Sequence, residues 1–268
     1  MNFDEMTKKY QELHIKTPTK KMIKTKEQIE GIRQAGIINT KVLDYVESHI
    51  RAGMSTEEID QMVAMKTKEL GGICAPLGYE GFPKSVCTSR NDAVCHGIPS
   101  AYEILEAGDI INVDCTTIYN GYYADASRTF MIGKVDKVAK HLVEVSKECL
   151  DLAVKQLKPY SRLGDIGHVI EQHAKKNGFS VVHEIGGHGV GIEFHEDPYV
   201  SHYGRPNTGM VLFPGMVFTI EPMINEGSRQ VFLDASNNWT IYTDDGGWSS
   251  QFEYTIAITE EGIEILAH

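Results

Sequence analysis

The feature that most constrains the fold is a pair of strand-like segments around an Asn-Gly dipeptide. Residues 109–119 are rich in Ile, Val, Thr and Tyr, and residues 122–132 resume a similar composition after Asn120-Gly121. Asn-Gly between two such runs is the strongest short-range signal of a β-hairpin with a two-residue turn. A turn of this length fixes the register, because the residues that flank it must pair with each other.

That register places two acidic side chains close together. Thr116 pairs with Asp125, and Asp114 shares the face of Thr116 because side chains alternate between the two faces of a strand. Asp114 and Asp125 become diagonal neighbours, with backbones about 7–8 Å apart. Apolar residues surround both, so the two negative charges need a cation between them. That cation is either a metal ion or a basic side chain, and Arg128 is the nearest alternative in sequence.

Two further carboxylates interrupt apolar runs in the C-terminal third of the chain. Glu221 follows the run 217–220 and precedes Pro222, which ends regular sheet pairing. Glu253 lies within the strand-like run 251–259. These runs contain almost no Lys or Arg, so four carboxylates embedded in strands indicate a shared purpose.

One imidazole belongs to the same hypothesis. His188 lies in the run Gly-Gly-His-Gly-Val-Gly at 186–191, where glycines let a ligand approach the ring. The segment from His183 to His188 resembles the metalloprotease pattern H-E-x-x-H, but its spacing is one residue too long, so we reject that match. Four carboxylates and one imidazole favour Mn²⁺, Fe²⁺ or Co²⁺ over a thiolate-type zinc site. Because five side chains exceed what one catalytic ion needs, we expect two ions about 3.5–4 Å apart.

Two pairs of amphipathic helices accompany the strands. Capping-box patterns predict helices that start at Thr25 and Ser55, and a second pair is predicted over 137–157 and 163–177. Positions 107 residues apart match faintly between the pairs: Ile59 with Ile166, Val63 with Ile170, and Gly71 with Gly178. If it reflects a duplication, this repeat predicts a pseudo-twofold α/β sandwich with a site near the seam between its halves.

Length, charge and cysteine usage limit the function classes. The 268 residues suit one α+β domain over 23–268, preceded by an N-terminal extension over 1–22. The net charge of −11 disfavours nucleic acid as a partner, and we interpret the lysines between residues 8 and 26 as solvated. The five cysteines show no C-x-x-C spacing, which argues against a disulfide framework or zinc knuckle. With no membrane-spanning run and no signal sequence visible, we expect a cytoplasmic protein.

Several motifs around these residues are shared with a known family. They are Gly-Tyr-Glu-Gly-Phe-Pro-Lys-Ser at 78–85, Cys-His-Gly-Ile-Pro at 95–99, Asn-Val-Asp at 112–114, Tyr-Ala-Asp-Ala-Ser-Arg-Thr-Phe at 123–130, Gly-His-Gly-Val-Gly at 187–191, Thr-Ile-Glu-Pro at 219–222 and Gln-Phe-Glu at 251–253. From about residue 23 to the C-terminus, the chain resembles the type I methionine aminopeptidases of peptidase family M24.

The resemblance implies the pita-bread (creatinase/aminopeptidase) fold, a two-half α/β sandwich around a central antiparallel sheet. It implies a dinuclear metallo-exopeptidase that removes the initiator methionine from nascent or newly made proteins when the next residue is small. The two divalent ions would be Co, Mn or Fe, with Zn and Ni as further candidates. Their ligands would be Asp114, Asp125, His188, Glu221 and Glu253, with Asp125 and Glu253 bridging.

The resemblance also assigns roles around the metals. A metal-bound hydroxide would attack the scissile carbonyl, with Glu221 as general base and acid. His195 would polarise that carbonyl, and His96 would contact the peptide nitrogen of the following residue. The free α-amine would bind a metal ion. The methionine pocket would be formed by Tyr79, Phe82, Cys87, Phe194 and Trp239, whose aromatic and sulfur groups suit a thioether.

Three positions depart from common patterns of the family and are expected around the pocket mouth: Pro76, Glu80 and Arg90. Their effect on substrate range stays open. The expected partners are N-terminal peptides of nascent proteins, with a transient ribosome contact left open; no membrane partner is expected, and the chain is expected to be a monomer. Two alternatives are a proline-directed peptidase, which usually has an additional N-terminal domain, and a non-enzymatic binding protein, which would have lost metal ligands.

Overall fold

The structure is a computed structural model that describes residues 2–268. Its helices are α1 (Phe3–Glu12), α2 (Lys26–His49), α3 (Thr56–Glu69), α4 (Lys137–Gln156) and α5 (Leu163–Lys176), with 3₁₀ turns η1 (Lys20–Met22) and η2 (Tyr79–Gly81). Its strands are β1 (Ile73–Cys74), β2 (Cys87–Arg90), β3 (Ala93–Cys95), β4 (Ile110–Tyr119), β5 (Tyr122–Met131), β6 (Ser180–Val181), β7 (Gly187–Gly189), β8 (Glu196–Val200), β9 (Val217–Ile220), β10 (Met223–Asn225), β11 (Val231–Leu233), β12 (Ile241–Thr243), β13 (Ser249–Gln251), β14 (Tyr254–Ile258) and β15 (Ile263–Ala267).

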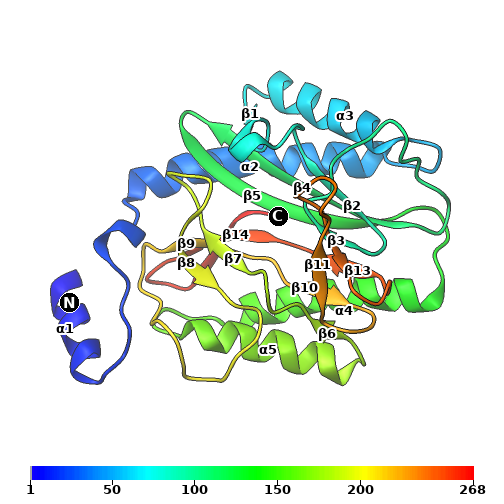
Figure 1. Cartoon of the computed structure of the whole chain (residues 1–268). Coiled ribbons are helices and arrows are strands. Elements are labelled where there is room, and N and C mark those ends of the chain that lie inside the picture. The colour runs from blue at the N-terminus through cyan, green and yellow to red at the C-terminus, as the bar shows by residue number, and fades with distance from the viewer. Residues whose placement is uncertain (1) are drawn as a thin grey trace.

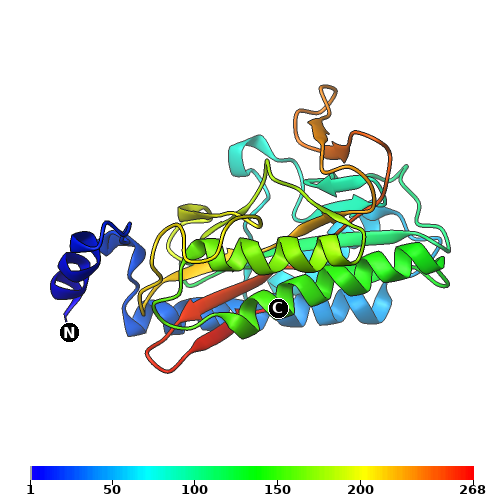
Figure 2. The ribbon, with the colours of Figure 1, turned by 90° about the horizontal axis from the view of Figure 1, so that it is seen from below.

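Two helix pairs enclose the strands. Figure 1 shows α2 and α3 along one edge, α4 and α5 along the opposite edge, and the strands between them. Helix α2 packs on β4 and β5, whereas α4 packs on β10 and β13. Figure 2 shows α4 and α5 side by side, with the orange hairpin of β11 and β12 projecting from the body. This two-half arrangement confirms the expected pita-bread architecture.

The predicted helix boundaries are confirmed. Thr25 and Ser55 cap α2 and α3 in capping boxes, in which each side chain accepts the N–H three residues later. The second helix of each pair is followed by a glycine in the left-handed region, with φ of +83° at both Gly71 and Gly178. The repeat positions are also buried alike, since Ile59, Val63, Ile166 and Ile170 are each at most 1% exposed.

The hairpin has the predicted register. Thr116 lies opposite Asp125, and Tyr119 lies opposite Tyr122. Both turn residues have positive φ, +50° at Asn120 and +82° at Gly121, as a two-residue turn of this hand requires. The side chain of Asn39 on α2 donates to the carbonyl oxygens of Cys115 and Ala124, which ties the helix to both strands of the hairpin.

Two expected continuous strands are each divided in two. Residues 216–224 form β9 and β10, with Glu221-Pro222 between them, and residues 251–259 are interrupted at Phe252-Glu253. The physical reason is a change of sheet: β9 pairs with β14, whereas β10 pairs with β13 in a separate sheet. The two segments pass between the sheets next to each other, and each carries a glutamate where it does so.

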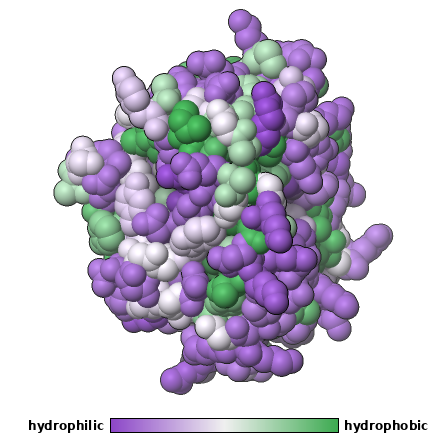
Figure 3. Space-filling view, turned by 90° about the vertical axis from the view of Figure 1, so that its right-hand side faces the viewer, coloured by the Kyte–Doolittle hydropathy of each residue, from purple (hydrophilic) through white to green (hydrophobic). Residues whose placement is uncertain are grey.

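The N-terminal extension contains a short helix, α1, that packs on the second half. Its Phe3 and Tyr10 rings lie 5.9 Å and 5.6 Å from the ring of Phe213, measured between centroids. Met1 lies outside the described residues. On the face shown in Figure 3, hydrophilic side chains predominate and apolar ones are scattered among them. Within residues 2–268, no helix is long and apolar enough to cross a membrane.

We predict that Gly36→Ala destabilises the protein although alanine favours helices. A Cβ at this position of α2 would lie 2.0 Å from the backbone oxygen of Leu266, so the helix would have to move away from β15. The expected loss is about 1–3 kcal/mol in the free energy of unfolding, measured by urea denaturation with chelator present. The control is Lys41→Ala on the exposed face of α2, expected within about 0.5 kcal/mol of the parent. A Gly36→Ala protein as stable as the parent would contradict the packing argument.

Candidate metal centre

The five expected ligands come from different elements and meet at the base of one pocket. They are Asp114 on β4, Asp125 on β5, His188 on β7, Glu221 after β9 and Glu253 before β14. One ligand atom from each of Asp125, His188 and Glu253 lies within 4.8 Å of the others. Asp114 lies close enough to Asp125 and Glu253 for the pKa values of these carboxyls to depend on one another. The structure therefore brings all five side chains together.

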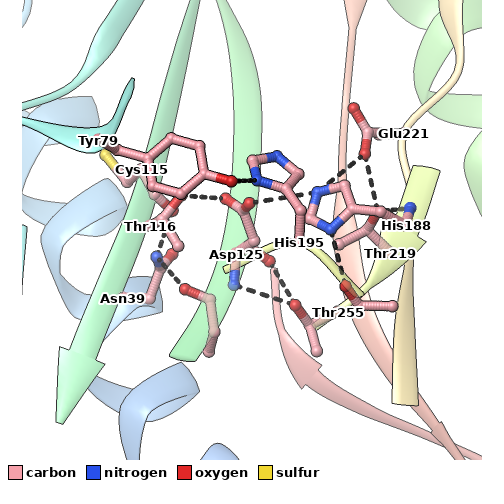
Figure 4. A network of polar contacts seen from close by, with 12 residues as sticks. Asn39, Tyr79, Cys115, Thr116, Asp125, His188, His195, Thr219, Glu221 and Thr255 are labelled. Carbon is pink, nitrogen blue, oxygen red and sulfur yellow. Dashed lines mark hydrogen bonds and ion pairs between the residues drawn. The ribbon is translucent and has the colours of Figure 1, made fainter. Parts of the chain in front are cut away.

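The His188 ring shows which of its nitrogens faces the acids. Its Nδ1 lies 3.0 Å from the carbonyl oxygen of Gly189, so Nδ1–H donates there. Its Nε2 then carries a lone pair, and it lies 3.7 Å from a carboxylate oxygen of Asp125 and 3.6 Å from one of Glu221 (Figure 4). Lone pairs that face lone pairs repel one another unless a cation lies between them. This arrangement fits a metal ion bound through Nε2.

Protonation states follow from burial. Burial raises the pKa of Asp114 to about 7 and that of Glu221 to about 8. Burial, followed by repulsion from the neighbouring carboxylates, raises the pKa values of Asp125 and Glu253 well above their ordinary range. Burial lowers the pKa of His188 to about 3, with a smaller contribution from His195, so its imidazole is neutral. A divalent ion would reverse this cost for the acids, because it favours their charged forms.

The alternative cation, Arg128, is excluded as the partner of the acids. Its guanidinium donates to Asp44 and Glu47 on α2 and to the carbonyl oxygen of His268. As far as the chain is described, the residues that line the pocket include no Lys or Arg. The four carboxyls therefore have no basic side chain in this lining: protons neutralise them in the metal-free protein, and a divalent ion would compensate their charged forms.

Sequence reasoning missed the residues that hold the ligands in place. The Thr219 hydroxyl donates to Glu221 at 2.7 Å and accepts the His188 backbone N–H at 3.0 Å. Gln251 donates to the other oxygen of Glu221 at 3.1 Å, and Thr116 donates to Asp125 at 2.8 Å. The i, i+2 spacing on one strand could have revealed Thr219, because such residues share a face.

Glu221 is also held through its backbone. Its N–H donates to Nε2 of His202, a ring that is 1% exposed and whose pKa burial lowers to about 3. No motif in the sequence marks His202, since it lies 19 residues from Glu221 and reaches it only in the folded chain.

Above the five ligands lies a cavity of about 490 Å³. All residues expected to contact substrate line it: Tyr79, Phe82, Cys87, His96, Phe194, His195 and Trp239. The Tyr79 hydroxyl lies 2.9 Å from Nδ1 of His195, whose ring lies 4.2 Å from that of His188 between centroids (Figure 4). Burial raises the pKa of Cys87 well above its ordinary value, so this residue presents a neutral thiol.

Of the three unusual positions, Pro76 and Glu80 lie in the pocket lining. The expectation that Arg90 sits at the mouth is wrong. Arg90 lies on β2, where its guanidinium pairs with Asp109 at 3.2 Å and Glu103 at 3.6 Å. The Arg90 side chain turns towards these two acids in the neighbouring loop. Their proximity arises only in the folded chain, so the sequence did not reveal it.

The fold and the site together define the class: a metal-dependent hydrolase with a carboxylate-rich centre. Residues 30–260 match the model of metallopeptidase family M24. Methionine aminopeptidase A of Synechocystis is 50% identical over 242 residues, which cover 90% of this chain and 95% of that relative. The crystal structure of methionine aminopeptidase from Rickettsia prowazekii aligns with a TM-score of 0.90 and 39% identity, covering 92% of this chain and 99% of that chain.

Prolidase from Pyrococcus furiosus has the same fold at lower similarity. It aligns with a TM-score of 0.72 and 27% identity, and the match covers 92% of this chain but only 65% of the prolidase. The chain belongs to the methionine aminopeptidases of metallopeptidase family M24.

We predict that the metal-free protein loses stability as pH rises from about 6.5 to about 8. In this interval the unfolded chain has ionised Asp114 and Glu221, whereas the folded chain still holds protons on them, so the free energy of unfolding falls with pH. The buried histidines His188 and His202 are neutral in the folded chain, and above about pH 7.5 they are neutral in the unfolded chain as well, so their opposing contribution is confined to the lower part of the interval. The expected fall is about 1–3 kcal/mol, measured by urea denaturation with chelator.

The matched control is Asp114→Asn, whose amide does not titrate and which should show a shallower slope. Adding Mn²⁺ to the parent protein at pH 8 should restore the lost stability. A free energy of unfolding that rises over this interval in the metal-free parent would contradict the assignment.

Proposed function

We propose that this centre carries out the removal of N-terminal methionine for which the family is named. The observation that carries the proposal is the set of oxygen and nitrogen acceptors, from Asp125, His188 and Glu253, that converge without a basic partner below an aromatic pocket. The use of a divalent metal follows from membership of a metallopeptidase family.

Two ions would suit this donor set better than one, with Asp125 and Glu253 among the residues that would hold them. Asp114, His188 and Glu221 would complete the coordination, and the hard oxygen donors favour Mn²⁺, Fe²⁺ or Co²⁺, with Zn²⁺ and Ni²⁺ as weaker candidates. When bound, such ions supply Lewis-acid activation of water and of the scissile carbonyl. The buried carboxylates hold this chemistry in a site of low dielectric.

Glu221 is proposed to act as the general base and acid for the proton transfers of the reaction. Burial raises its pKa to about 8 in the metal-free protein, and bound metal would lower that value towards neutrality. A group that titrates near the working pH can both accept and return a proton. Thr219 and Gln251 each occupy one of its two oxygens and so keep the carboxylate aimed at the centre.

His195 and His96 are proposed to hold the peptide bond. The Tyr79 hydroxyl accounts for Nδ1 of His195, which leaves Nε2 for the scissile carbonyl oxygen. Burial lowers the pKa of His96 to about 4, so this ring is neutral and could accept or donate one hydrogen bond at the next peptide nitrogen. Both rings line the same pocket as the five ligands.

The methionine side chain would enter the aromatic part of the pocket. Phe82 and Trp239 form an edge-to-face pair with centroids 5.2 Å apart, and Cys87 adds a buried thiol to the same pocket lining. Rings and sulfur make favourable contacts with a thioether. The proposed substrates are N-terminal peptides of nascent proteins in the cytoplasm, with a small second residue.

We further propose that residues 23–268 form the catalytic domain and that the chain acts as a monomer. A transient ribosome contact of the extension over 1–22 is consistent with its exposed lysines, among them Lys20 and Lys21. Neither a specific nucleic acid nor a membrane is proposed as a partner.

Release of methionine from a short peptide tests the proposed reaction. Purified protein supplied with Mn²⁺ or Co²⁺ should release methionine from the peptide Met-Ala-Ser, and chelator should abolish the activity. Peptides Met-Pro and X-Pro serve as controls for a proline-directed enzyme. Failure with every metal tried, or preference for the X-Pro peptide, would count against methionine removal by this centre.

Two substitutions separate metal binding from activation of the scissile carbonyl. Glu221→Ala should lose bound metal, measured by elemental analysis, together with activity. His195→Ala should keep its metal but lose about 10²–10³-fold in kcat, as expected when one hydrogen bond to the developing oxyanion is removed. Equal metal content in the parent and Glu221→Ala proteins, with undiminished activity, would indicate a binding role instead of catalysis.

A further inference from the structure

One carboxylate fastens the loop that carries two pocket residues. This loop, residues 191–196, joins β7 to β8 and is called here the histidine loop. The Oε1 of Glu196 accepts the backbone N–H of Ile192 at 2.7 Å and that of Glu193 at 3.1 Å. Gly191 N–H donates to the Glu193 carbonyl at 3.1 Å. Glu196 thus closes the loop on itself.

The second oxygen of the same carboxylate pairs with Lys24. The Lys24 side chain is 2% exposed and that of Glu196 is 15% exposed, so the pair is shielded from water. Loss of either partner leaves the other charge buried without compensation, which is far costlier than loss of a surface ion pair. The lysine-rich segment is therefore not solvated throughout, since Lys24 is a buried exception to that interpretation.

Lys24 is itself fixed by the body of the protein. Its backbone N–H donates to the Gly215 carbonyl at 2.8 Å, and Ile23 forms a β-bridge with Met216. Gly215 in turn donates to the Ile258 carbonyl on β14 at 2.8 Å. Figure 1 shows the blue segment between α1 and α2 passing beside the strands of this sheet. The ammonium group therefore reaches the histidine loop from a backbone tied to the central sheet.

Apart from this ion pair, the start of the loop is held by the Tyr123 backbone N–H, which donates to the Gly191 carbonyl at 2.9 Å. A cavity of about 730 Å³ separates the loop from the N-terminal segment, with Lys20 and Lys21 on one wall and Ile192 and Glu193 on the other. On its opposite side the loop presents His195 to the Tyr79 hydroxyl. Lys24 and Glu196 both belong to the lining of this cavity, so their ion pair joins the N-terminal segment to the loop at its edge.

We infer that Lys24 is a positioning residue: its ion pair with Glu196 sets where the histidine loop places His195 and Phe194 in the pocket. The Phe194 and His195 rings lie 4.3 Å apart between centroids, so a shift of the loop displaces both together. The inference rests on the role proposed for His195. It connects a residue that touches neither substrate nor ligands to the rate of the reaction.

Lys24→Met in the metal-loaded, full-length protein tests this link. We expect kcat for Met-Ala-Ser to fall about 10–100-fold, because displacing a catalytic group by about 1 Å has effects of this size. Bound metal should be unchanged, and amide hydrogen exchange in residues 191–196 should accelerate. Glu196→Gln should act in the same direction, since its amide oxygen still accepts the loop N–H groups but no longer carries the charge. Lys21→Met, on the exposed part of the same segment, is the matched control and should resemble the parent.

A double substitution decides whether the effect runs through His195. In the His195→Ala background, Lys24→Met should lower kcat by no more than about threefold, because residues that act as one unit are not additive. Losses that multiply in the double variant, or unchanged kcat and exchange in both Lys24→Met and Glu196→Gln, would overturn the inference. If His195→Ala alone leaves kcat unchanged, the role proposed for His195 fails instead. Should Lys24→Met not fold, Glu196→Gln and its combination with His195→Ala give the same readouts.

Discussion

The structure depends on a cluster of buried acidic side chains that, within residues 2–268, has no Lys or Arg in its pocket lining. Asp125, Glu253 and their neighbours are almost fully enclosed, and burial raises their pKa values well above normal. The neutral ring of His188 adds a further acceptor that points at the same place. Such a set is unfavourable by itself and becomes favourable around divalent cations. Hydrogen bonds from Thr116, Thr219 and Gln251 compensate only part of the charge on the carboxylates. These three side chains therefore orient the carboxylates more than they neutralise them.

The sheet topology explains why these acids can converge. Two segments of the chain, β9–β10 and β13–β14, each pass from one sheet to another at a glutamate, where regular strand pairing ends. The crossings at Glu221 and Glu253 lie at the same level, beside the face of the hairpin that carries Asp114 and Asp125. A strand that continued through either glutamate would have to alternate its side chains regularly, which would restrict where the carboxylate points. The interruptions thus belong to the site.

Catalytic groups and scaffold are joined through segments far apart in sequence. Helix α2 is tied to the hairpin by Asn39, and the residue pair Lys24–Glu196 links the start of that helix to the histidine loop. The elements around the pocket are therefore joined by contacts between segments that are distant in the sequence. Such long-range ties resist the small displacements to which catalysis is most sensitive.

The sequence alone determined the hairpin register and the capped helix starts, because each is encoded by local patterns of two to four residues, and it singled out the five candidate ligands. It also gave the family, through motifs that surround the ligands. Tertiary structure decided what local patterns do not encode: the change of sheet at Phe252-Glu253, the support of Glu221 by His202, the burial of Lys24 and the turn of Arg90 towards Asp109. These features depend on which distant segments come into contact in the folded chain. Burial and charge compensation arise only from those contacts, so local sequence patterns do not encode them.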